Sequence, residues 1–279
     1  TILGFNNNSD TNTSSIVAGK NNTLSNNTTV TVFGSSHDIS VNSVDSLISG
    51  NQNKETTGTN NATFGKTNVT VTSTNSLTTG LSNKLTTATN SLTTGESNTG
   101  ADITNSIILG KDNSANTVIR TIIGGENNTI SQTTNSFANG KQNSLSSDNY
   151  SAVTGYNNTL INTTGTLVSG DNNTLTNTIR DIVQGVSNQV NNSNDTIMVG
   201  ESNQATNSER ASIFGYNLTI TNSKNSILSG HSNSENDSDN NATFGHLNSV
   251  TSSSNVISMG KSNTTSDSSN CQVTGDTNS

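Results

Sequence analysis

The 279-residue chain contains no proline and no tryptophan, a single cysteine and only 3% aromatic residues. One cysteine, Cys271, allows no internal disulfide, so an extracellular location would not be supported by disulfide stabilisation. Charged residues make up 11% of the chain, and its formal net charge is -8. This acidic balance offers no basic patch for phosphates, so we expect no nucleic-acid partner. No apolar run approaches the roughly 20 residues that span a bilayer, and no secretory leader is recognisable, so we expect no membrane insertion by this sequence.

The remaining composition is polar, with Asn, Ser and Thr dominant and a mean hydropathy of -0.54. Such a composition is typical of disordered chains. The low charge and the missing proline argue against disorder, because disordered segments are usually enriched in both. A polar chain can still fold when short units repeat and stack, so periodicity decides between the two interpretations.

The glycines are periodic. Nineteen of the 23 fall on one register with steps of 15 residues, except for one step of 16 between Gly34 and Gly50. The residue three places after the glycine is Asn in 17 of the 19 repeats, and the exceptions are His37 and Leu218. Positions are numbered below from this repeat glycine, which is position 0. The register runs through the whole chain, which predicts one domain over residues 1–279 and a fragment of a longer surface protein.

Fifteen residues suit one coil of two short strands and two turns. Gly marks a turn that needs positive φ or a close backbone approach, and Val, Ile and Thr favour strands. A helical repeat needs about 33 residues or more. The prediction is therefore an all-β parallel β-solenoid of about 18 coils of 15 residues.

Three apolar rows are expected to form the core. Positions -3 and -1 share one face of a strand, and small residues at one often accompany Phe at the other, as in Ala62 and Phe64. Because such volume compensation is typical of packed interiors, we expect both positions to point inward. A third inward row is expected at position +5, and its apolar members are Leu24, Ile39, Leu85, Ile130, Leu145, Leu160, Leu175, Val190, Ile220 and Val250.

Position -2 is then expected to point outward, although it is apolar in 14 of 19 repeats. A continuous exposed apolar stripe of this kind marks an interface, and closed cyclic assemblies are the common solution for identical subunits. Simple strand propensity of β-branched residues is the alternative. The predicted subunit interface consists of Val17, Val32, Ile48, Ile108, Ile123, Val153, Val168, Val183, Met198, Ile213 and Leu228.

The Asn row at position +3 has two interpretations. The side chains could form an inward ladder of amides, one coil spacing apart, or they could hold a left-handed turn conformation that Asn tolerates. Both roles are structural, and the row alone does not choose between them.

The repeat can be written Asn-Ser-apolar-x-x-Gly-x-x-Asn-x-apolar, as in residues 105–110 (NSIILG) and 225–230 (NSILSG). This resembles the head repeat of the trimeric autotransporter adhesins, the YadA-like head, with its Asn-Ser-Val-Ala-Ile-Gly type of motif. The resemblance implies a homotrimer of left-handed β-rolls on the bacterial cell surface, anchored in the outer membrane through a C-terminal region that is not in this sequence. Departures are the 15-residue period and Asn in place of the Ala-rich segment after the glycine.

The resemblance also implies a function. The chain is expected to be an adhesin head that binds a host protein, either an immunoglobulin-like cell-adhesion molecule (such as a CEACAM) or an extracellular-matrix protein. Tyr and Arg are frequent at binding hot spots. If they line one outer edge, the candidate ligand-binding residues are Tyr150, Arg120, Arg180 and Arg210 at position -5 and Tyr156 and Tyr216 at position +1; isolated solvated side chains are the alternative.

Two other functions stay open. The chain could be a passive spacer in a fibrous adhesin, or an ice-binding solenoid, for which Thr78-Thr79 and Thr93-Thr94 are the only hint of a Thr array in this strand. We expect no enzyme, cofactor or metal site. His231 and His246 follow the repeat glycine in adjacent coils, and an acidic cluster lies at residues 235–239, but exposed turn residues explain both.

Overall fold

The computed structural model describes residues 1–40 and 42–279 and is built almost entirely of β-strands. No helix occurs in these residues, and so none that could cross a membrane. The fold is a parallel β-solenoid of about 18 coils, which confirms the predicted architecture. Two compact units are described separately below, Thr1–Gln142 (unit 1) and Asn143–Ser279 (unit 2).

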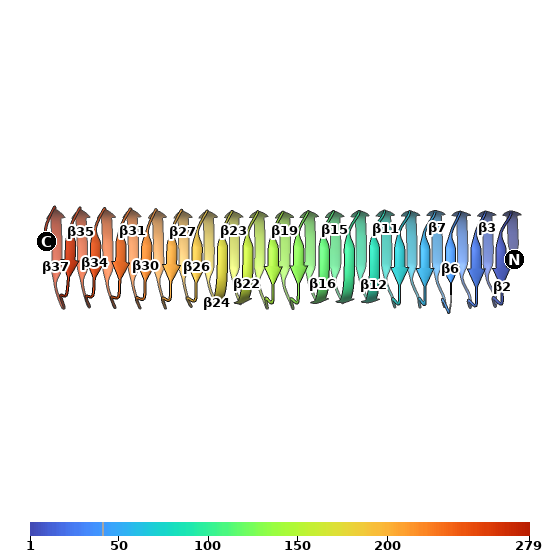
Figure 1. Cartoon of the computed structure of the whole chain (residues 1–279), viewed down its shortest axis with the longest axis horizontal. Coiled ribbons are helices and arrows are strands. Elements are labelled where there is room, and N and C mark those ends of the chain that lie inside the picture. Colours follow the sequence, from blue (N-terminus) through green and yellow to red (C-terminus); the bar gives the residue numbers. More distant parts are fainter. Residues whose placement is uncertain (41) are drawn as a thin grey trace. The chain divides into compact units, whose positions relative to one another are not determined.

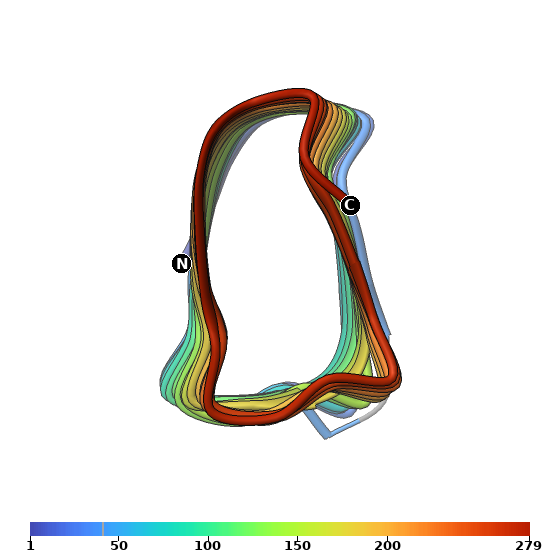
Figure 2. The same ribbon diagram turned by 90° about the vertical axis from the view of Figure 1, so that its left-hand side faces the viewer.

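Each coil contributes one strand to face A, which contains the repeat glycine, and one to face B (Figures 1 and 2). In unit 1, face A consists of β1 (Ile2–Phe5), β3 (Ile16–Lys20), β5 (Thr31–Ser35), β7 (Leu47–Asn51), β9 (Ala62–Lys66), β11 (Leu77–Leu81), β13 (Leu92–Glu96), β15 (Ile107–Lys111), β17 (Ile122–Glu126) and β19 (Phe137–Lys141). Face B of unit 1 consists of β2 (Asn8–Asp10), β4 (Thr23–Ser25), β6 (Asp38–Ser40), β8 (Lys54–Thr56), β10 (Val69–Val71), β12 (Lys84–Thr89), β14 (Thr99–Thr104), β16 (Ser114–Ile119) and β18 (Thr129–Ser131).

Unit 2 repeats this pattern. Its face A consists of β21 (Ala152–Tyr156), β23 (Leu167–Asp171), β25 (Ile182–Val186), β27 (Ile197–Glu201), β29 (Ser212–Tyr216), β31 (Ile227–His231), β33 (Ala242–His246), β35 (Ile257–Lys261) and β37 (Gln272–Asp276). Its face B consists of β20 (Ser144–Ser146), β22 (Thr159–Thr164), β24 (Thr174–Ile179), β26 (Gln189–Asn191), β28 (Gln204–Thr206), β30 (Thr219–Thr221), β32 (Ser234–Asn236), β34 (Ser249–Thr251) and β36 (Thr264–Ser266).

Neighbouring coils pair in parallel and in register. Leu92 pairs with Ile107 in unit 1, and Ile182 pairs with Ile197 in unit 2, each exactly one repeat apart in sequence. Equivalent residues of successive coils therefore lie in straight rows within each unit, at the strand spacing of about 4.8 Å. The register on either side of the 16-residue repeat places the extra residue between Ser40 and Asn42, at position 41, so the predicted bulge lies outside the described residues.

Four positions of each coil turn the backbone with positive φ. In the coil that starts at Gly125 they are Gly125 itself, Asn127, Gln132 and Asn135, which represent positions 0, +2, +7 and +10. The repeat glycine has a φ of 101° here, and a Cβ at this position would lie 1.9 Å from the carbonyl oxygen of Gly140. Only glycine fits such a conformation with such a close backbone approach.

The Asn row at position +3 forms an inward ladder, as one of its two interpretations predicted. The Nδ2 of buried Asn98 donates to the carbonyl of Gly110 at 2.7 Å, and its Oδ1 accepts from the backbone N–H of Asn113 at 3.0 Å. The left-handed conformation belongs to the preceding residue, at +2. Each amide thus satisfies buried backbone groups that the strands leave free at this turn.

His37 takes the place of one Asn in this ladder. Its Nδ1 accepts from the backbone N–H of Asn53 at 3.2 Å, so Nε2 is the donor toward the carbonyl of Phe33 at 3.1 Å. Burial lowers the pKa of this imidazole, which favours the neutral ring that can do both.

The predicted core is correct in one row and inverted in the others. Position +5 is buried throughout its apolar members, as expected: Leu24, Ile39, Leu85, Ile130, Leu145, Leu160, Leu175, Val190, Ile220 and Val250 are at most 1% exposed. On face A, however, position -2 points inward, whereas positions -3 and -1 point outward. The interior between the faces is one side-chain layer thick, so it admits only one row of the face A strand.

Candidate interaction surfaces

The predicted subunit interface is wrong in its residues, because all eleven side chains lie in the core of the chain itself. The exposed fraction is at most 1% for Val17, Val32, Ile48, Ile108, Ile123, Val153, Val168, Val183, Met198, Ile213 and Leu228. These residues pack against the +5 row of face B and cannot contact another subunit without unfolding. The apolar stripe on the outside consists of their neighbours on the same strands.

The outer apolar stripe lies at position -3 of face A. Eight of its side chains between Ile122 and Ile257 lie along both units, and the exposed fraction of Ile122 is 42% and that of Ile182 is 43%. The fully exposed members are Ile16, Leu47, Leu77, Ile122, Phe137, Leu167, Ile182, Ile197, Ile227 and Ile257. Position -1 adds Phe33, Leu109, Phe214, Phe244 and Met259, which are also exposed. Neither row contains a charged residue.

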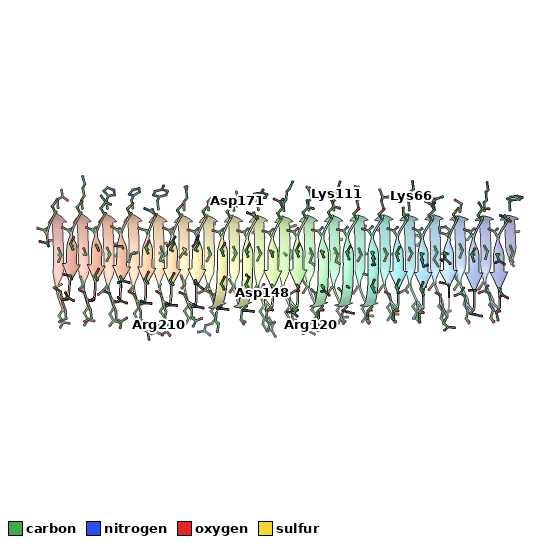
Figure 3. All side chains as sticks on the ribbon, viewed as in Figure 1. Lys66, Lys111, Arg120, Asp148, Asp171 and Arg210 are labelled. Atoms are coloured by element: carbon green, nitrogen blue, oxygen red, sulfur yellow. The ribbon has the colours of Figure 1, made fainter. Side chains whose placement is uncertain are left out.

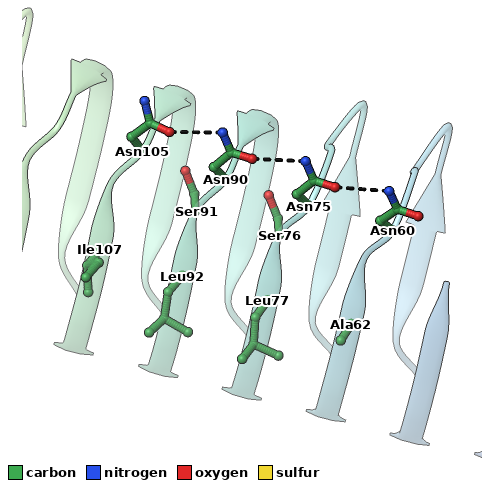
Figure 4. A pocket seen from close by; sticks show the side chains of 10 residues that line it. All are labelled: Asn60, Ala62, Asn75, Ser76, Leu77, Asn90, Ser91, Leu92, Asn105 and Ile107. Atoms are coloured by element: carbon green, nitrogen blue, oxygen red, sulfur yellow. Dashed lines mark hydrogen bonds between the residues drawn. The ribbon is translucent and has the colours of Figure 1, made fainter. Parts of the chain in front are cut away.

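In unit 1 this stripe forms one wall of a groove, and a row of Asn side chains forms the other (Figure 4). The amide of Asn60 donates to Asn75, which donates to Asn90 and then Asn105, at 3.0–3.1 Å. These residues occupy the left-handed turn at position +10. The opposite wall consists of Ala62, Leu77, Leu92 and Ile107. The groove is therefore uncharged, with amides on one side and aliphatic side chains on the other.

The six candidate ligand-binding residues do not share an edge. Tyr156 and Tyr216 lie at the carboxyl end of their face A strands, whereas Tyr150 and Arg210 precede the amino ends of such strands. Within each unit, Figure 3 shows the two edges apart: Lys111 marks the first and Arg120 the second in unit 1, and Asp171 and Arg210 mark them in unit 2. Their expected common edge is therefore wrong.

The arginines at position -5 are held by the next coil. The guanidinium of Arg180 donates to both carboxylate oxygens of Asp195, at 2.6 and 2.8 Å, and lowers the pKa of that carboxyl. Arg120 donates to Asn135, and Arg210 donates to Asn225, each through Nε at 2.5 Å. Tyr150 is 63% exposed and is the most accessible side chain of this edge.

The opposite edge of unit 2 carries a stack of three rings at position +1. The ring of Tyr216 stacks on that of His231 with centroids 5.0 Å apart, and His231 and His246 are 4.8 Å apart. Within the described residues, no group of three metal-ligating side chains occurs. The acidic cluster at residues 235–239 is dispersed, because Glu235 points into the core while Asp237 and Asp239 are exposed.

Four buried carboxyl groups were not anticipated as special positions. Glu55 and Glu235 stand in the +5 row, and Asp148 and Asp181 occupy other inward rows. Each is at most 2% exposed and has one carboxyl oxygen without a hydrogen-bond partner. Burial raises the pKa of all four, to about 7 for Glu235 and to about 6 for Asp148 and Asp181.

The surroundings of these carboxyls are neutral hydrogen-bonding groups. Ser46 Oγ donates to Glu55 at 2.5 Å, and Ser226 makes the equivalent bond to Glu235. Gly58 leaves the space for Glu55, since a Cβ there would lie 2.2 Å from its Oε1. The register alone could have identified these acids, because Glu interrupts an otherwise apolar row.

No protein-family model matches the chain, and no curated protein matches it. Among solved structures, a protein described as an acetyltransferase from Desulfovibrio desulfuricans G20 is 11% identical with a TM-score of 0.18, and 80% of this chain is covered. The UDP-N-acetylglucosamine acyltransferase from Campylobacter jejuni is 13% identical with a TM-score of 0.13, and 70% of this chain is covered. The chain spans 65% and 66% of the length of these two proteins. Likenesses at this level carry no argument about chemistry.

Proposed function

We propose that this chain is a non-catalytic head segment of a bacterial surface adhesin that assembles as a homotrimer through face A. The observation that carries the proposal is the outer stripe at position -3. It is apolar, lacks charge and recurs at the spacing of the coils, and large exposed apolar patches mark protein contacts. A second copy of the same chain presents a stripe with the same spacing, so the rows can match along their length.

The left-handed sense of the coil and the anchoring in an outer membrane through a region beyond this sequence belong to the same proposal. The repeat motif that resembles the YadA-like head supports them. The partner in this proposal is a host protein, an immunoglobulin-like cell-adhesion molecule or a matrix protein. The exposed Tyr150 and the ring stack around Tyr216 supply aromatic side chains of the kind that dominate protein interfaces.

The assembly is tested with a matched pair of variants on one strand. Ile122→Asp places a charge on the exposed stripe, whereas Ser229→Asp places one at position -1 of a different coil, where the side chain is half-buried and polar. The proposal predicts that Ile122→Asp reduces the solution mass from trimer to monomer without changing the far-ultraviolet circular dichroism. An unchanged mass for a folded Ile122→Asp variant would contradict it.

Receptor binding is tested on immobilised matrix proteins and on immunoglobulin-like receptor domains. Tyr216→Ala and Tyr150→Ala each alter one edge, so a loss in only one of them identifies the edge that binds. If the trimeric chain binds none of these proteins while a longer chain does, the segment is a spacer and the receptor part of the proposal fails.

A further inference from the structure

Face B of unit 2 presents an ordered array of hydroxyl groups. Its outward positions are +4 and +6, on either side of the buried +5 row. Of these 18 side chains, 13 are Ser or Thr and none is charged. The +4 row is Ser144, Thr159, Thr174, Gln189, Gln204, Thr219, Ser234, Ser249 and Thr264, and the +6 row is Ser146, Ile161, Thr176, Asn191, Thr206, Thr221, Asn236, Thr251 and Ser266.

The array is regular in two directions. Successive coils pair in register, as Thr174 does with Gln189 and Thr219 with Ser234, so neighbours in a row are separated by about 4.8 Å. The two rows are about 6.6 Å apart, the distance between residues two apart in a strand. Every repeat from Gly140 to Gly275 has 15 residues, so no insertion interrupts the rows.

The hydroxyls of this face are available to solvent. All 18 side chains are half-buried or exposed. One hydrogen bond joins two of them, from Ser234 to Ser249 at 3.3 Å. Threonine is stiff at χ1, so each Thr offers its oxygen and its methyl group in few orientations. Water bound in such an array is held at fixed spacings before any partner arrives, which reduces the entropy lost on binding.

Unit 1 provides an internal contrast. Its face B carries Asp10, Asp38, Lys54 and Lys84 at the same two positions, and Lys54 forms an ion pair with Asp38 at 3.0 Å. Charged groups orient water around themselves and interrupt a neutral lattice. The feature is therefore a property of unit 2 and does not follow merely from the repeat.

We propose that face B of unit 2 binds the surface of ice. A neutral face with hydroxyls and methyl groups repeating in two directions is complementary to a crystal of water, whose oxygen atoms also repeat in rows a few ångströms apart. A flexible soluble ligand would gain nothing from such extended regularity. The ice-binding hypothesis from the sequence placed the Thr array on face A, but there Thr78 and Thr93 are buried and only Thr79 and Thr94 point outward. The inference does not depend on the adhesin proposal, since it uses another face.

The experiment freezes a dilute solution of the purified chain slowly and compares the protein concentration in the ice with that in the remaining liquid. The test variant carries Thr206→Lys and Thr221→Lys, on adjacent coils of face B. The control carries Thr164→Lys and Asn194→Lys, which lie beyond the turn that ends this face and add the same charge. Circular dichroism confirms folding, and Thr174→Lys serves as a second test variant at another coil.

The proposal predicts enrichment of the wild-type chain and of the control in the ice, and loss of enrichment in the folded test variants. Exclusion of the wild-type chain from ice overturns the proposal. Equal behaviour of test and control variants also overturns it, because binding would then not involve face B.

Discussion

The Asn ladder offers the sharpest test of how this polar chain stays folded. Replacing Asn113 with Ala removes an amide that donates to the carbonyls of Leu109 and Gly125, at 3.0 and 2.8 Å. It also removes the acceptor of the backbone N–H of Asn128, at 3.0 Å. Asn113 is 1% exposed, so water cannot replace these bonds without opening the turn.

The magnitude follows from the groups left without partners. A buried polar group that loses its partner costs about 1–3 kcal/mol, so two such groups lower the free energy of unfolding by about 2–6 kcal/mol. Asn116→Ala is the matched control, because Asn116 is exposed on face B of the same coil and should cost less than about 0.5 kcal/mol.

Urea denaturation and hydrogen exchange measure this effect together. Because a solenoid can unfold coil by coil, the exchange rate of the amide of Asn128 gives the local effect that a global transition would blur. The account predicts faster exchange at Asn128 in Asn113→Ala and unchanged exchange in Asn116→Ala. Similar stability of the two variants would refute the structural role of the ladder.

Three further predictions follow from the same coordinates. Gly125→Ala should prevent or severely weaken folding, whereas Gly124→Ala should be mild, because a Cβ at Gly124 meets only the end of a side chain; thermal melts compare them, and equal melting temperatures would contradict the turn argument. Glu235 has a folded-state pKa raised to about 7, so its contribution is complete below the unfolded value of about 4.3 and is lost as pH rises to about 7; Glu235→Gln should melt higher than the wild type at pH 8 and not at pH 4, and a parallel pH dependence in both proteins would disprove this. Ile123→Asp should unfold the chain while Ile122→Asp leaves it folded, as circular dichroism would show; a folded Ile123→Asp variant would mean that the faces are inverted.

Much of the fold could be predicted because glycine and Asn recur at fixed positions. The 15-residue period predicts coils, and the apolar +5 row is flanked by polar residues, so its inward direction is unambiguous. Leu85 and Leu160 illustrate this, since each is fully buried. The Asn ladder was one of two interpretations, and only the side-chain geometry distinguishes it from a left-handed turn.

The direction of the face A strand could not be read from the sequence. In residues 107–109 all three consecutive side chains are apolar, so a period of two does not show which of them is inside. The compensation between Ala62 and Phe64 was interpreted as core packing, but both side chains lie on the outer surface, and Thr63 between them is buried. Small and large neighbours can therefore alternate on an exposed face as well.

The candidate site residues were limited by the same problem. Tyr and Arg were identified by type, and the structure shows Tyr150 and Tyr216 to be exposed as expected. Their separation onto two edges depends on how many residues lie between the turns, which the repeat alone does not define. The hydroxyl array of face B was visible in the sequence as pairs such as Thr174 and Thr176, but it becomes a surface only when the coils are stacked in register.

The solution mass of the purified chain tests the central claim most directly. Sedimentation equilibrium of the 28.9 kDa chain should give three times this mass, because the uncharged apolar stripe of face A is then covered by copies of itself. A stable, folded monomer at the concentrations used for binding would contradict the proposed assembly and with it the trimeric adhesin head.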